Sequence, residues 1–220
     1  MTIQELTLQY WSYYLLLEKR FLETVSYAEL HPDNFSVFSN NYALLMQVIG
    51  AELDTMFKLY CGFTMSERKN ISDYVKAIDN EESTVKPKHA LDYPFRGQKI
   101  ILTEYDITIQ PFKDWDSTKP KQSLIWWDAF DKLKHDRFNN RKLANQENAL
   151  NILGALFFVE MKYLKKITEG TKEVDVFDTV SNLFTLPSWS IKYIHFGNVF
   201  SIMSEMIDKG KAYRPEPTDV

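Results

Sequence analysis

Apolar side chains recur every three or four residues along four long segments of the chain, which is the spacing of amphipathic helices. The segments span residues 1–30, 39–61, 122–138 and 145–167. The second segment is followed by Gly62, a residue type that commonly ends helices. The fourth segment is apolar on nearly every side, which places it either at the centre of a bundle or in a dimer interface.

Between the second and third of these helices, apolar residues recur at every second position instead of every third or fourth. One side of the alternation holds Ile101, Thr103, Tyr105, Ile107 and Ile109, with Ile100 and Leu102 as exceptions on the other. Alternation is typical of β-strands. We therefore expect a small insertion at about residues 99–112, formed by one strand or by two short strands that turn near residues 104–106.

The remaining segments carry weaker patterns. We expect a short helix at 72–78, loops at 79–93 and 114–121, and further helices at 174–184 and within 193–209. Residues 212–220, which include two prolines, are expected to be a disordered tail. The chain has only 7 Gly and 8 Pro in 220 residues, so connections are few. The prediction is a mainly α helical bundle with a β insertion, forming one domain over residues 1–211.

Charge and cysteine content narrow the function classes. The net charge is −4, so the overall field does not attract nucleic acid, and RNA binding would require a local cluster of cations. The best such cluster is formed by Lys132, Lys134, Arg137, Arg141 and Lys142. A single cysteine, Cys61, excludes an intrachain disulfide. The longest apolar run, 149–159, is shorter than the roughly 20 residues of a membrane span, and no signal peptide is visible. We expect a cytoplasmic protein without membrane contact.

The densest chemistry lies in the third helix. A helical wheel places Trp126, Ala129, Phe130 and Leu133 on one side and Asp128, Asp131, Lys134 and His135 on the other. Asp131 and His135 are four residues apart, so their side chains can touch. A carboxylate orients an adjacent imidazole and favours its protonated form. Such a pair suits general acid–base work on a phosphodiester, with Lys134 or Arg137 near the phosphate. The alternative is a solvated helix surface.

The string Trp126-Trp127-x-Ala129-Phe130-Asp131-x-x-Lys134-His135-x-Arg137, followed by an alanine- and leucine-rich helix, resembles the HEPN superfamily over residues 39–165. The resemblance implies a helical bundle that is often dimeric. It also implies, for many members, metal-independent ribonuclease activity in toxin–antitoxin and anti-phage systems, whereas other members are non-catalytic.

The family's catalytic signature is an arginine, a polar residue and then a histidine. His135 matches the histidine and Asp131 resembles the polar position. Phe130 stands where the arginine belongs, and Arg137 follows the histidine instead. Lysine does not offer the planar fork of arginine. Whether the chain is an enzyme is therefore left open.

Two main hypotheses follow. In the first, a homodimer pairs through the third and fourth helices and cleaves RNA. His135 acts as acid or base, Asp131 orients it, Lys134 or Arg137 stabilises charge, and Lys132, Arg141 and Lys142 hold the RNA. In the second, the chain is a non-catalytic dimerisation or protein-interaction module. An antitoxin or another protein is a candidate partner of the chain. No metal-ligand spacing or phosphate loop is present, so neither hypothesis includes a metal or cofactor.

Three residues are assigned structural or partner-contact roles. Glu52 lies on the rim of the apolar stripe of the second helix, where a carboxylate needs a partner or access to solvent. Trp126 and Trp127 begin the third helix. A third hypothesis is a small-ligand pocket lined by tryptophans. Its candidate residues are Trp11, Trp115, Trp126, Trp127 and Trp189.

Overall fold

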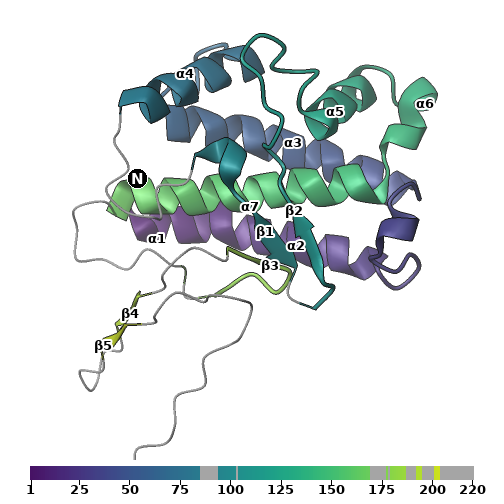
Figure 1. Cartoon of the computed structure of the whole chain (residues 1–220), viewed down its shortest axis with the longest axis horizontal. Helices are drawn as coiled ribbons and strands as arrows, with labels where there is room; N and C mark the ends of the chain where they lie inside the picture. The colour runs from purple at the N-terminus through teal and green to yellow at the C-terminus, as the bar shows by residue number, and fades with distance from the viewer. Residues whose placement is uncertain are drawn as a thin grey trace, which may run out of the picture.

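The computed structural model describes residues 1–84, 94–102, 104–168, 177 and 179–186, and the backbone of 192–194 and 201–203. The fold is mainly α with a small antiparallel sheet against the helices, which confirms the predicted fold class (Figure 1). The helical elements are α1 Ile3–Leu6, the π-helical turn η1 Thr7–Trp11, α2 Ser12–Thr24, the 3-10 turn η2 Pro32–Asn34, α3 Asn40–Cys61, α4 Ile71–Thr84, the 3-10 turn η3 Phe95–Gly97, α5 Ile125–His135, α6 Arg137–Asn140, the 3-10 turn η4 Arg141–Leu143 and α7 Gln146–Thr168. The strands are β1 Ile100–Leu102, β2 Ile107–Ile109, β3 Phe184–Thr185, β4 Lys192–Ile194 and β5 Ser201–Met203.

The two long central helices form where the apolar pattern predicts them. The hydroxyl of Ser39 caps α3 by accepting a hydrogen bond from the amide of Tyr42 at 3.1 Å. Gly62 ends α3 with a φ of 74°, a left-handed conformation that costs glycine little. Helix α7 is buried by its own chain along most of its length. It is therefore central to the bundle, so the open choice between a core helix and a dimer-interface helix is settled in favour of the core.

The first helix is shorter and less regular than expected. It begins with a capping box between Thr2 and Glu5, passes through η1, and ends at Thr24 instead of residue 30. At η1 the side chain of Trp11 turns inwards. Its indole N–H donates to the carbonyl of Thr179 at 2.6 Å, and its ring stacks on Phe177 at 4.1 Å between centroids. The first helix is thus tied to a segment near the other end of the described chain.

The predicted insertion is a hairpin of two short strands. β1 and β2 pair antiparallel with Ile100 opposite Ile109, and β3 pairs with the other edge of β1. The expected facing was wrong for the first strand. Ile100 and Leu102 are buried together with Ile107 and Ile109, because the turn between the strands resets the alternation. The sheet packs closely on α7, where a Cβ on Gly154 would lie 2.6 Å from Ile109 Cδ1.

Three further expectations need correction. Helix α4 extends to Thr84, beyond the predicted helix at 72–78, so the start of the predicted loop at 79–93 is helical. Phe184 belongs to β3, which contradicts the end of the helix expected at 174–184. Residues 192–194 and 201–203 are paired strands where a helix was expected within 193–209. The predicted tail at 212–220 lies outside the described residues.

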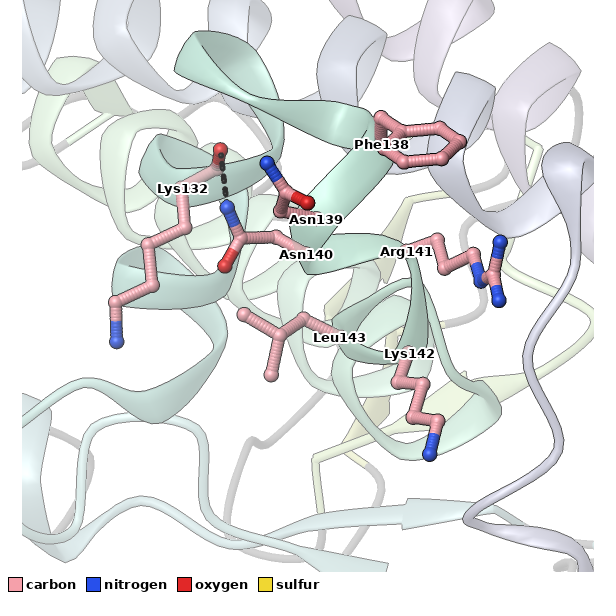
Figure 2. Close-up of a pocket in the computed structure, with 7 residues that line it drawn as sticks. All are labelled: Lys132, Phe138, Asn139, Asn140, Arg141, Lys142 and Leu143. Carbon is pink, nitrogen blue, oxygen red and sulfur yellow. Dashed lines mark hydrogen bonds between the residues drawn. The ribbon is translucent and has the colours of Figure 1, made fainter.

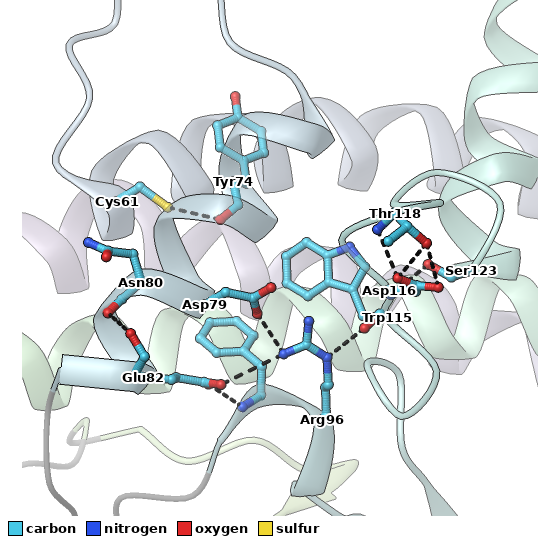
Figure 3. Close-up of polar contacts among 12 residues, drawn as sticks. Cys61, Tyr74, Asp79, Asn80, Glu82, Arg96, Trp115, Asp116, Thr118 and Ser123 are labelled. Carbon is cyan, nitrogen blue, oxygen red and sulfur yellow. Dashed lines mark hydrogen bonds and ion pairs between the residues drawn. The ribbon is translucent and has the colours of Figure 1, made fainter.

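A polar clasp fixes the connection that leads to α5 (Figure 3). The guanidinium of Arg96 donates from Nη1 to Asp79 Oδ1 at 2.7 Å and from Nε to the carbonyl of Trp115 at 2.5 Å. Glu82 accepts a hydrogen bond from the amide of Phe95 at 2.7 Å. These contacts join α4 and η3 to the loop before α5. In the part of the chain that the structure describes, no helix combines the length and apolarity needed to cross a membrane.

Candidate functional site

Helix α5 presents the two faces that its sequence predicts. Trp126, Trp127, Phe130 and Leu133 are buried against the rest of the bundle, whereas Lys134 and His135 are exposed. The indole N–H of Trp126 donates to the carbonyl of Pro111 at 2.7 Å. The two tryptophans are side chains of the core, and they orient the polar face of α5 away from it.

The polar face does not continue to residue 138 as one helix. Asp136 adopts a φ of −149°, which breaks the helix and starts α6. Its carboxylate accepts hydrogen bonds from the backbone amide and the side-chain amide of Asn139, at 3.2 and 2.6 Å. These bonds keep the pKa of Asp136 below its usual range. An aspartate that caps the next helix therefore ends the predicted one early.

The structure brings His135 and Asp131 together. His135 Nε2 lies 3.6 Å from Asp131 Oδ1, and the imidazole side chain is 72% exposed. Asp131 also accepts a hydrogen bond from the ammonium group of Lys121, a residue that the sequence analysis assigned only to a loop. The carboxylate thus sits between an imidazole and an ammonium group, and the imidazole faces solvent.

The expected cations follow one another along the same stretch of sequence, and four of the five contact groups other than His135. Lys132 forms an ion pair with Asp128 at 2.5 Å, and Lys134 lies over the ring of Phe130. Arg137 does not turn towards His135. Its Nη1 donates to Asn40 Oδ1 at the start of α3, at 3.1 Å. Arg141 lies over the exposed ring of Phe138, and Lys142 is exposed.

The position that the HEPN signature gives to arginine is a core position in this chain. The ring of Phe130 packs so closely on α3 that a Cβ on Gly50 would lie 2.4 Å from it. Phe130 itself is 7% exposed. A guanidinium there would have to be buried against a helix backbone, at a large desolvation cost. The packing of α3 on α5 therefore requires an apolar side chain at position 130 and does not accommodate the arginine of the signature.

A hollow of about 500 Å³ opens beside the site, where α6 and η4 turn back towards α7 (Figure 2). The side chains that line it are cationic, amide or apolar, and none is acidic. They include Lys132, Phe138, Asn139, Asn140, Lys142 and Leu143. The sequence analysis missed Phe138 and the two asparagines as site residues. It treated the helix as continuous to 138, so nothing indicated a turn that would expose them together.

The rim carboxylate Glu52 has an unexpected neighbour. Glu52 is half-buried, and burial raises its pKa. It interacts electrostatically with Glu160 of α7, which is fully buried. Burial raises the pKa of Glu160 well above the usual carboxyl range, and the proximity of Glu52 raises it further. Tyr10 of the π-helical turn interacts electrostatically with both carboxyls. The sequence signal for Glu160 was its place at the end of an otherwise apolar run.

Among the described residues the tryptophans do not share one ligand pocket, although Trp126 borders a hollow of about 150 Å³. Trp11, Trp115, Trp126 and Trp127 are each buried in the core, and Trp189 lies outside the described residues. Among the residues that the structure places, no group of three or more His, Cys, Asp or Glu side chains is arranged to hold a metal ion.

No protein-family model matches the chain, no curated protein matches it, and no solved structure matches its fold.

Proposed function

We propose that the surface formed by α5, α6 and η4 binds RNA and that the chain cleaves it without a metal ion. One observation carries the proposal: a solvent-facing imidazole, His135, lies 3.6 Å from Asp131 on a helix whose exposed side also carries Lys132 and Lys134. The whole chain carries a net charge of −4, so a local cationic surface stands out against an acidic background. The resemblance to the HEPN superfamily points to the same substrate class.

The chemistry needs only groups that RNA and the protein supply. His135 in its neutral form takes the proton of a ribose 2′-hydroxyl, and the 2′-oxygen attacks the adjacent phosphorus. The bond between phosphorus and the 5′-oxygen breaks, which leaves a 2′,3′-cyclic phosphate. The departing 5′-oxygen takes a proton from an imidazolium, supplied by the His135 of a second copy of the chain. Asp131 orients the imidazole, and Lys134 offsets charge on the phosphate.

Dimer formation through α5 fits this scheme better than pairing through α7. The exposed face of α5 carries His135 and Lys134, whereas α7 is covered by its own chain along most of its length. Arg137 would reach the phosphate only by giving up its hydrogen bond to Asn40. An antitoxin or another protein partner would regulate the activity by covering the same surface.

The test is a cleavage assay on single-stranded RNA in EDTA. We expect the wild type to release cyclic-phosphate ends and His135→Ala to lose at least about a hundredfold in rate, the usual contribution of a general acid or base. His31→Ala is a matched control, because His31 is also an exposed imidazole beside a carboxylate, with Asp33 Oδ2 3.4 Å from its Nδ1. Equal rates for the wild type and His135→Ala would discard the assignment.

A second candidate is a non-catalytic interaction module. The buried Phe130 in the arginine position favours it, and so do the exposed apolar side chains of Leu44 and Phe138. In this case Asp131 and His135 stabilise the end of α5, where a cationic side chain is favourable. The absence of cleavage by pure wild-type protein, together with a stable homodimer that Phe138→Asp separates, would support this candidate over the first.

A further inference from the structure

The hollow beside the site has one side chain with a fixed orientation. The side-chain amide of Asn140 donates from Nδ2 to the carbonyl of Asp136 at 2.8 Å and to the carbonyl of Lys132 at 3.4 Å. Both acceptors are backbone atoms of the α5–α6 junction. Because two carbonyl oxygens hold the nitrogen, the amide cannot exchange its nitrogen and oxygen without losing both bonds.

The other end of this amide remains available to a ligand. Within the described part of the chain, Asn140 Oδ1 accepts no hydrogen bond from the protein. In Figure 2 this oxygen points to the same side as Leu143, into the region between Lys132 and Lys142. The hollow thus combines an apolar surface, a fixed acceptor and flanking ammonium groups.

These three features match the parts of a nucleotide. A base can rest on Leu143, and its phosphates can lie near Lys142 and Lys132. An amide whose hydrogens are both used acts only as an acceptor. Cytosine presents an amino group where uracil presents a carbonyl oxygen. An acceptor that meets a second acceptor leaves both unsatisfied, which is unfavourable. The ring N–H of uracil can also donate to Asn140 Oδ1, but it lies between two carbonyl oxygens that then face this oxygen, whereas the amino group of cytosine has only one neighbouring ring acceptor.

We infer that Asn140 is a specificity-determining residue that selects RNA bases with an exocyclic amino group over uracil. The inference rests on the proposed binding of RNA, but not on cleavage. A neutral hydrogen bond that cytosine makes well and uracil makes poorly corresponds to about a three- to tenfold difference in Kd.

The test compares short oligomers of cytidine and of uridine by fluorescence anisotropy. The two bases are equal in size and differ mainly at the amino or carbonyl position. The 2′-fluoro forms of both oligomers lack the attacking hydroxyl, so cleavage does not disturb the titration. We expect the wild type to bind the cytidine oligomer about three- to tenfold more tightly, and Asn140→Ala to bind both equally.

Asn151→Ala is the matched control. Asn151 also donates from Nδ2 to the carbonyl four residues before it, that of Glu147, at 2.9 Å, but it does not line this hollow. Its variant should keep the wild-type preference. Equal affinities in the wild type, or a preference that survives Asn140→Ala, would overturn the inference and leave RNA binding in place. Absence of binding to both oligomers would overturn RNA binding as well. The wild-type comparison decides even if Asn140→Ala fails to fold.

Discussion

Two glutamates of the described core, Glu18 and Glu160, are both buried, but their carboxyl groups have opposite surroundings. Glu18 on α2 is 1% exposed and is surrounded by donors. Its Oε2 accepts from the hydroxyls of Tyr14 and Ser181, and its Oε1 accepts from the amide of Asn182 at 2.8 Å. Glu160 on α7 is fully buried, and neither of its oxygens accepts or donates a hydrogen bond among the described residues.

The difference teaches what a buried carboxyl requires. Glu18 is stabilised by segments that come from both ends of the described chain, because Tyr14 shares its helix and Ser181 and Asn182 arrive from beyond α7. Glu160 is fully buried and lies near Glu52; burial, and to a lesser extent the Glu52 carboxyl, raises the pKa of Glu160 well above the usual carboxyl range. The carboxylate of Glu18 joins two segments through hydrogen bonds, whereas the carboxyl of Glu160 is buried without hydrogen bonds from the described residues that would offset its desolvation.

The largest expected effect on stability comes from removing the Glu18 carboxylate. Glu18→Ala removes the acceptor of three donors, so the hydroxyls of Tyr14 and Ser181 and the amide of Asn182 lose their shared partner. We expect the free energy of unfolding to fall by about 3–5 kcal/mol, measured by urea denaturation.

Glu23→Ala is the control for this variant, because Glu23 is an exposed glutamate of the same helix that pairs with Arg20 at 3.0 Å. Its effect should stay below about 1 kcal/mol. Equal losses in the two variants would mean that the hydrogen bonds of the Glu18 carboxylate contribute no more than an exposed ion pair.

Glu160 should behave in the opposite direction. Glu160→Met replaces an unsatisfied buried carboxyl with an apolar side chain of similar length, so we expect the free energy of unfolding to rise by about 1–3 kcal/mol. The same urea titration measures the change. Glu160→Gln keeps the shape and polarity but cannot ionise, and it should not reproduce the gain. A destabilised Glu160→Met protein would contradict the picture of an uncompensated group.

The smallest effect, counted per pH unit, and the most specific one is a pH dependence of stability. The raised pKa of Glu160 means that the folded state binds its proton more tightly than the unfolded state. Stability from this group is therefore complete below the ordinary carboxyl pKa and is lost as the pH rises through the range between the unfolded and folded pKa values. The stability difference between Glu160→Met and the wild type should grow by at most about 1.4 kcal/mol per pH unit above pH 5.

Urea titrations of both proteins at several pH values between 5 and 8 measure this slope. Titration of every other group is nearly common to the two proteins, so the difference isolates Glu160 and its coupling to Glu52. A difference that stays constant over the whole range would show that Glu160 ionises in the folded protein as easily as in the unfolded chain.

The proximity of Asp131 and His135 is the part of the candidate site that the sequence could predict. They lie one helical turn apart, and that distance is set by local geometry. The contact of Lys121 with Asp131 and that of Arg137 with Asn40 join segments distant in sequence or separated by a break, and no local period encodes them. The helix was predicted to run to residue 138, because the capping role of Asp136 depends on how α6 turns back. A helix that continues to residue 138 leaves no room for the hollow, so the sequence did not predict the hollow.

The sequence by itself determined the long helices α3 and α7 and the presence of a short β segment between them, because the apolar period and the residues Ser39 and Gly62 act within a few residues. Only the tertiary structure decided which faces of β1 are buried, that Phe184 joins the sheet, and that Phe130 fills the space an arginine would need. It also decided the different surroundings of Glu18 and Glu160. The physical reason is that periodicity and capping are local interactions, whereas desolvation and hydrogen-bond satisfaction depend on groups brought together from more than a hundred residues away.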